Sequence, residues 1–137
     1  MNPTGRLAGD IAQALVAEGF TVHRYDAMKT DSVYLKLDYG ACNSIRVSDH
    51  PGYPHLKYRY NIGSWIESYA EVEDRYPRFF WPMGSADELV ARCVADRANR
   101  LDWCGELGYR EIVDRKKREA RRARTGFWTH ARKVKRR

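Results

Sequence analysis

The string Ser48-Asp49-His50 contains the three side-chain types of a hydrolytic triad, in which histidine takes a proton from serine. Three adjacent residues rarely point at one reacting atom, and the chain has no glycine-flanked nucleophile motif that would build an oxyanion hole. Because Pro51 and Gly52 follow, the string is more typical of a turn in which Asp49 accepts hydrogen bonds from backbone N–H groups. The sequence therefore predicts no catalytic residue, and a binding contact by Asp49 and His50 is the alternative to a purely structural turn.

Carboxylates are the second set of candidates, because a metal-dependent nuclease needs several of them around one ion. Four aspartates fall near the ends of expected strands: Asp26, Asp31, Asp38 and Asp49. No spacing singles them out as ligands, and the three cysteines are not spaced as zinc ligands either. We expect neither a metal nor another cofactor, and a metal-dependent nuclease is kept as a distant alternative to a non-enzymatic protein.

The basic C-terminal tail is the third set. The last 23 residues contain 12 Lys or Arg against one Glu, a net charge of +11, whereas the preceding 114 contain 13 bases against 17 acids, a net charge of −4. Such a tail on a mildly acidic body is typical of contact with RNA or DNA, and a solubilising role is the alternative. The candidate contacts are Arg115, Lys116, Lys117, Arg118, Arg121, Arg122, Arg124, Arg132, Lys133 and Lys135, with Trp128 between the basic runs as a stacking partner for bases.

An N-terminal helix is expected from about Pro3 to Glu18. Asn2 is a good N-cap, and proline is common at the first helical position. Leu7, Ile11 and Leu15 then form an apolar stripe at helical spacing. The stripe predicts that this helix covers one face of a sheet.

Alternation with period two over the next forty residues predicts an antiparallel meander of three or four strands, each with one buried and one wet face. The strand around Val33 to Leu37 alternates most clearly, and the stretch from Phe20 to Tyr25 is the optional fourth strand. The outward positions include Tyr34, Lys36, Arg46, Lys57 and Arg59, which could hold a phosphate backbone or simply face water.

C-terminal helices complete the expected α+β domain, which spans residues 1–114 and is followed by a partly flexible or helical extension over 115–137. Ser85 and Glu88 match a capping box, and the helix that they open is expected to end near Gly105. A further helix is expected from about Tyr109, and a short acidic one from Trp65 to Arg75. Phe79 to Trp81 are expected to pack on the core.

The expected compartment is the cytoplasm. The N-terminal residues lack the apolar region of a signal peptide, and no stretch approaches the roughly 20 apolar residues of a membrane span. The sequence thus indicates no membrane partner.

Two strings give a resemblance to a known family. Met28-Lys29-Thr30-Asp31-Ser32-Val33-Tyr34, followed by Tyr39-Gly40, and then Ile45-Arg46-Val47-Ser48-Asp49-His50 are similar to a segment of small phage and mobile-element proteins. Among these are broad-spectrum anti-CRISPR inhibitors of type II-A Cas9, which join a compact α/β core to a very basic N-terminal segment. The resemblance implies a phage-encoded inhibitor in a bacterial host cell that binds a Cas effector or another nucleoprotein. A sequence-independent nucleic-acid-binding accessory protein is the alternative, and the resemblance implies no catalytic residue.

Overall fold

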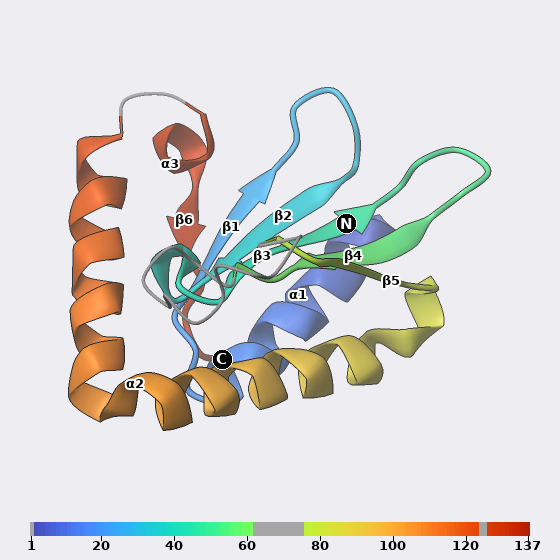
Figure 1. Ribbon diagram of the computed structural model, residues 1–137. Coiled ribbons are helices and arrows are strands. Elements are labelled where there is room, and N and C mark those ends of the chain that lie inside the picture. The colour runs from blue at the N-terminus through green and yellow to red at the C-terminus, as the bar shows by residue number, and fades with distance from the viewer. Residues whose placement is uncertain (1, 62–75, 124–125) are drawn as a thin grey trace.

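The computed structural model describes residues 2–61, 76–123 and 126–137 (Figure 1). It has an N-terminal helix, a six-stranded antiparallel sheet in the order β5-β4-β3-β2-β1-β6, and a long C-terminal helix. The predicted α+β class is confirmed. The predicted helix from Trp65 to Arg75 and the candidate Arg124 lie outside the described residues.

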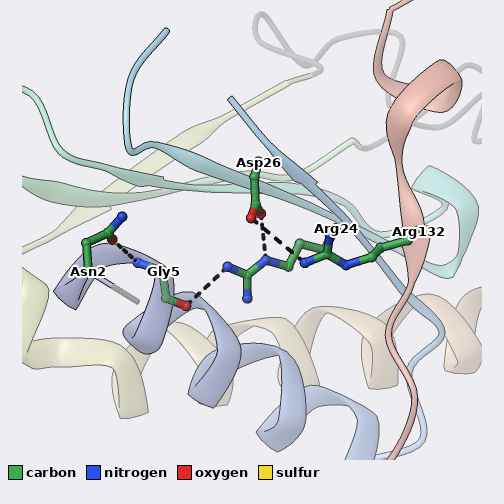
Figure 2. Close-up of polar contacts among 5 residues, drawn as sticks. All are labelled: Asn2, Gly5, Arg24, Asp26 and Arg132. Atoms are coloured by element: carbon green, nitrogen blue, oxygen red, sulfur yellow. Dashed lines mark hydrogen bonds and ion pairs between the residues drawn. The ribbon is translucent and has the colours of Figure 1, made fainter. Parts of the chain in front are cut away.

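Helix α1 spans Pro3–Ala17 and begins as the sequence predicts. The Gly5 N–H donates to Oδ1 of the N-cap Asn2 over 2.7 Å, as Figure 2 shows. Ile11 and Leu15 are buried on the face that meets β1, β2 and β3. The apolar stripe therefore does cover one face of the sheet.

The meander consists of four strands, so the optional first strand exists. Its strands are β1 (Val22–Asp26), β2 (Val33–Leu37), β3 (Asn43–Ser48) and β4 (His55–Arg59). Leu35 pairs with Ile45, and both are completely buried or nearly so beneath α1. The alternation in the sequence thus corresponds to the two faces of the sheet, one packed under α1 and the other turned away from it.

Two further strands extend the sheet beyond the meander. β5 (Arg78–Trp81) pairs with β4. Phe79 and Trp81 pack against the core as predicted, whereas the prediction is wrong for Phe80, which is 52% exposed on the opposite face of the sheet because strand side chains alternate. β6 (Arg132–Lys133) lies in the basic tail and pairs with β1 at the other edge. The tail therefore contributes an edge strand, and whether residues 115–137 form a separate extension stays a prediction.

Helix α2 (Ala86–Arg122) is broken at Gly105, where φ is 72° and ψ is 166°, a conformation that suits only glycine. We call residues 106–122 its second arm, and Figure 1 shows this arm rising next to the short helix α3 (Phe127–His130). The break agrees with the predicted helix end. The predicted capping box is wrong, because Ser85 makes no side-chain cap hydrogen bond. Its backbone N–H instead closes the preceding 3-10 turn η3 (Met83–Ser85) by donating to the Pro82 carbonyl over 3.0 Å.

The chain end is fixed to both the sheet and α1. The Val134 N–H donates to the Val22 carbonyl over 2.8 Å, and the Val134 side chain packs against the core. Beyond it, the Arg137 N–H donates to Oε1 of Gln13, whose own side-chain amide donates to the Lys135 carbonyl. These contacts attach residues 134–137 to β1 and α1.

Two arginines from distant segments share the Asp26 carboxylate at this edge (Figure 2). The Arg24 Nε lies 2.7 Å from Oδ1, and the Arg132 guanidinium lies 3.8 Å from Oδ2. Arg24 also donates to the Gly5 carbonyl in α1. Arg132 therefore has a carboxylate partner on the side of the sheet that faces α1.

Candidate nucleic-acid interface

The sheet surface opposite α1 carries two rows of side chains that run across the strands. Antiparallel pairing brings outward residues of neighbouring strands directly opposite each other, so their side chains are in reach. The first row is Tyr25, Tyr34, Arg46, Lys57 and Phe80. The second row is Lys133, His23, Lys36, Ser44, Arg59 and Arg78. We call these eleven residues the outer face.

The outer face is strongly cationic. Its two rows contain six Lys or Arg residues and no Asp or Glu. The five candidates that the alternation assigned to the wet face, namely Tyr34, Lys36, Arg46, Lys57 and Arg59, all lie in these rows. Their placement on one surface is confirmed, and their binding role stays a prediction.

The cations of the outer face lower one another's affinity for protons. Burial lowers the pKa of Lys36 first, and Lys116 and Arg59 lower it further by repulsion. Burial also lowers the pKa of Lys57, with added repulsion from Arg78, Arg46 and Arg59. A bound anion would relieve this repulsion, because an opposite charge favours the protonated form of an amine.

Two guanidinium groups on this face have unused donors. The Nε atoms of Arg46 and Arg59 are buried and have no hydrogen-bond partner within the described ranges. The guanidinium groups lie over aromatic rings, Arg46 at 5.4 Å from the centroid of Tyr34 and Arg59 at 4.9 Å from that of Tyr76. An arginine stacked on a ring in this way can still offer its N–H groups to a phosphate.

The basic tail meets the outer face at several points but not throughout. Lys133 is in the second row, Lys116 lies near Lys36, and the Lys117 ammonium lies 5.8 Å from the ring centroid of Tyr39. Lys116 also pairs with Glu119 at 3.3 Å.

Other tail candidates lie elsewhere. Arg115 and Arg118 line a separate depression beside Ile112, while Arg121 and Arg122 are exposed at the end of α2. Arg132 pairs with Asp26, and the Lys135 carbonyl binds Gln13 in α1. The tail cations are therefore not a single surface.

Trp128 packs against the sheet. Its ring is stacked with that of Tyr39 at 6.2 Å and meets His23 edge-on at 5.1 Å. The Lys36 ammonium lies 5.4 Å from the Trp128 ring centroid. Trp128 thus supports the positions of Lys36 and His23, and a role in stacking on bases stays a prediction.

Burial lowers the pKa of His23, and Lys133 lowers it further.

The turn after β3 is held to the loop before β2 by hydrogen bonds of Asp49. Oδ2 of Asp49 accepts from the Asp31 N–H, and Oδ1 accepts from the Ser32 hydroxyl, each over 2.7 Å. The Ser32 hydroxyl and the Asp31 N–H hold the pKa of Asp49 below its ordinary value. Asp49 thus binds the loop before β2 rather than its own turn, because antiparallel pairing places the start of β2 beside the end of β3.

His50 is exposed in this turn. Its Nδ1 lies 3.0 Å from the Pro51 carbonyl, and its backbone N–H donates to the Ser48 hydroxyl. The ring makes none of the triad contacts to Ser48 or Asp49 that a hydrolase requires.

The four aspartates near strand ends do not come together at one point, although Asp31 and Asp49 are neighbours. Asp26 pairs with two arginines, whereas Asp38 is buried and accepts hydrogen bonds from the Thr21 N–H and the Tyr109 hydroxyl. Within the parts of the chain that the structure describes, no three His, Cys, Asp or Glu side chains are grouped as a metal site would require.

The two strings that carry the family resemblance meet in space. Residues 28–31 and Arg46, Asp49 and His50 line one depression of about 450 Å³. A neighbouring depression of about 710 Å³ shares Arg46 and adds Tyr25, Tyr34, Phe127 and His130. Tyr25, Arg78 and Phe80 were not identified from the sequence as members of the outer face. Tyr25 could have been predicted, because it follows the period-two alternation of the stretch from Phe20 to Tyr25, which was expected only as an optional fourth strand.

The fold and this surface define an α+β protein whose antiparallel sheet presents a cationic and aromatic face. Comparison with known proteins finds no matching family model, no matching curated protein and no matching solved structure. Among the helices of the described residues, none has the length and apolar character to cross a membrane.

Proposed function

We propose that the protein is a non-enzymatic nucleic-acid-binding protein whose outer face contacts the phosphate backbone. The observation that carries this proposal is the pair of rows with six Lys or Arg residues and no acid, spread over the whole width of the sheet. Cations arranged along a surface neutralise successive phosphates and release their counterions. Aromatic rings at both ends of the first row, Tyr25 and Phe80, add stacking surfaces that tolerate any base.

Removing two cations from the first row tests this proposal. The double variant Arg46→Gln/Lys57→Gln should bind RNA or DNA oligonucleotides about tenfold to a hundredfold more weakly, because charge-assisted hydrogen bonds are lost. Its slope of log affinity against log salt should be shallower by about 0.7 for each lost contact with a single strand. Fluorescence anisotropy across salt concentrations measures both quantities.

The matched control removes two charges elsewhere. Arg6 lies exposed on α1, and Arg110 lies exposed beside Gly19 and Arg97. The variant Arg6→Gln/Arg110→Gln has the same net charge as the first variant and should keep most of the affinity and slope. Equal losses in both variants would contradict a dedicated surface and indicate general attraction by the net charge alone.

We further propose that this binding serves the inhibition of a nucleic-acid-guided nuclease, with a Cas effector as the expected partner. What favours this over a plain accessory protein is that the two strings resembling anti-CRISPR proteins line one depression at the end of the outer face. His50 is exposed at its rim, where it is free to meet a protein surface. The inhibitor would then need both the cationic rows and this turn.

The variant His50→Ala separates the two functions. Because His50 lies outside both rows, its removal should leave oligonucleotide affinity unchanged. Inhibition of target cleavage by a guided nuclease should nevertheless fall about fivefold, as expected for an interface residue worth about 1 kcal/mol. Inhibition that depends only on oligonucleotide affinity across all variants would support the accessory protein instead.

A further inference from the structure

The depression of about 710 Å³ at the edge of the outer face has the composition of a site for a planar aromatic ligand with a negative charge. Two of its aromatic side chains come from the sheet, Tyr25 and Tyr34, and two from α3, Phe127 and His130. Among the described residues that line it, Lys29 and Arg46 are the two Lys or Arg residues, and none is an acid. The volume falls in the range of roughly 300–1,000 Å³ that is usual for ligand sites.

The rings in this depression are grouped around Tyr25 at distances that are usual for aromatic contacts. The Tyr25 centroid lies 6.1 Å from that of Tyr34, 6.0 Å from Phe127 and 6.4 Å from His130. The planes are tilted at 46°, 52° and 33°, so the rings are not stacked on one another. The rings therefore form a tilted aromatic wall against which a flat guest can lie, while one face of Tyr34 is already covered by the Arg46 guanidinium.

Arg46 adds a charge at the wall of the same depression. Its guanidinium lies over the Tyr34 ring, and its buried Nε has no hydrogen-bond partner among the described residues. Because Lys57 is the next residue of the first row, a chain of phosphates leaving the depression would meet further cations at once. An aromatic floor with an adjoining line of cations matches a base joined to its phosphate backbone.

We propose that this depression, formed by Tyr25, Tyr34, Arg46 and Phe127, receives one unpaired base of a single-stranded RNA or DNA whose backbone continues along the first row. The inference rests on the proposed nucleic-acid binding and adds a preference for single strands to it. In a duplex the bases are stacked inside the helix and cannot enter a pocket on a protein surface. A single strand has base faces free for stacking.

The test compares one labelled oligonucleotide as a single strand and as a duplex, in RNA and DNA versions of the same sequence. The native protein should bind at least one single strand about tenfold more tightly than the corresponding duplex. The variant Tyr34→Leu, which removes the ring but keeps an apolar side chain, should lose about tenfold in single-strand affinity and little in duplex affinity. Tyr34→Phe should restore the native value.

Tyr53→Leu is the matched control, because Tyr53 is 62% exposed and lies outside the depression. Phe127→Leu tests the same site from α3 and replaces Tyr34→Leu if that variant does not fold. A preference of RNA over DNA, or the reverse, identifies which nucleic acid the site takes.

Three results would overturn the inference. They are equal losses for single strand and duplex, no loss in the ring variants, or an equal loss in Tyr53→Leu. If Arg46→Gln/Lys57→Gln weakens binding while the ring variants do not, only the base site is wrong. If no oligonucleotide binds the native protein, the proposed function fails with it.

Discussion

A chain that ends at Ala123 should unfold about 10 °C or more below the full-length protein, even though it lacks only 14 residues and most of them are charged or polar. The deletion removes Val134 from the core, the backbone pairing of β6 with β1, and the rings of Phe127 and Trp128 from the outer face. Losing the burial of one such apolar side chain together with several hydrogen bonds should lower the free energy of unfolding by about 3 kcal/mol or more. That is a large part of a typical stability of about 5–15 kcal/mol.

Thermal and urea unfolding measure this effect, and a charge variant provides the control. Lys133→Gln/Lys135→Gln/Arg136→Gln removes three cations but keeps the backbone and Val134. Because surface substitutions usually change stability by no more than about 0.5 kcal/mol, this variant should melt close to the full-length protein. A truncated chain that unfolds together with the full chain would show that residues 124–137 contribute nothing to the fold.

The comparison of the truncated chain with the triple glutamine variant also shows how the charges of the tail are best studied. A truncation removes structure and charge together, so any loss of nucleic-acid binding has two explanations. The triple glutamine variant changes the charge alone. Binding assays on the tail are therefore best made with substitutions.

Asp38→Ala should cost about 3 kcal/mol, the second large effect. Asp38 is buried and ties three segments, since its Oδ1 accepts from the Thr21 N–H over 2.9 Å and its Oδ2 accepts from the Tyr109 hydroxyl in the second arm of α2. Its backbone also has a positive φ of 48°, which alanine tolerates poorly. Leaving a buried donor without an acceptor costs about 1–3 kcal/mol, and the backbone strain adds to that.

Asp38→Asn is the matched variant, because asparagine keeps an acceptor for the Thr21 N–H and adopts positive φ readily. Its stability at neutral pH should lie within about 1 kcal/mol of the native value. Urea unfolding of the three proteins gives the comparison. Equal stability of Asp38→Ala and the native protein would mean that this buried network is not needed for the fold.

The pH dependence of Asp38 has a defined sign. Burial raises the pKa of its carboxyl above the ordinary value of 3.8, against the opposing effects of the Tyr109 hydroxyl and the Thr21 N–H. A raised folded-state pKa means that the folded chain takes up this proton more readily than the unfolded chain. The stabilisation is thus complete below the ordinary pKa and is lost as pH rises through the folded-state pKa.

The native protein should therefore gain stability relative to Asp38→Asn as the pH falls from about 7 toward 4. The opposite trend would mean that the hydrogen bonds to the carboxylate outweigh its burial. Urea unfolding of both proteins across this pH range measures the difference.

The alternation of the sequence was enough to place four of the six cations of the rows on one sheet surface, because the side-chain period of a strand is two and short loops join antiparallel neighbours. These four are Lys36, Arg46, Lys57 and Arg59. Lys36 and Arg59 lie on different strands, yet their shared surface follows from where Leu35 and Tyr58 are buried. The N-terminal helix was equally readable, since Asn2 and Pro3 define its start by local chemistry.

β6 could not be predicted in this way. It has two residues, Arg132 and Lys133, and the apolar Val134 that follows is isolated between charges. No period can be recognised in so short a stretch, and its pairing with β1 depends on an edge formed by a distant segment. The Asp38–Tyr109 contact spans 71 positions, so it left no local pattern either. The depression beside α3 brings sheet residues such as Tyr25 together with α3 residues such as Phe127 that are far away in the sequence, which is why only some of its residues were predicted.

The pairing of β6 with β1 also governs how the chain reaches this structure. Val22 and Val134 are joined by a backbone hydrogen bond across 112 positions of the chain, whereas the hairpins of the meander close between near neighbours. Loop closure costs more entropy as the loop grows, and contacts of long range slow folding. The meander is therefore expected to form early, with the β1 edge uncovered until β6 arrives. During that interval the unpaired N–H and C=O groups of β1 are a template for another chain, so the late docking of a two-residue strand sets how long the protein is exposed to aggregation.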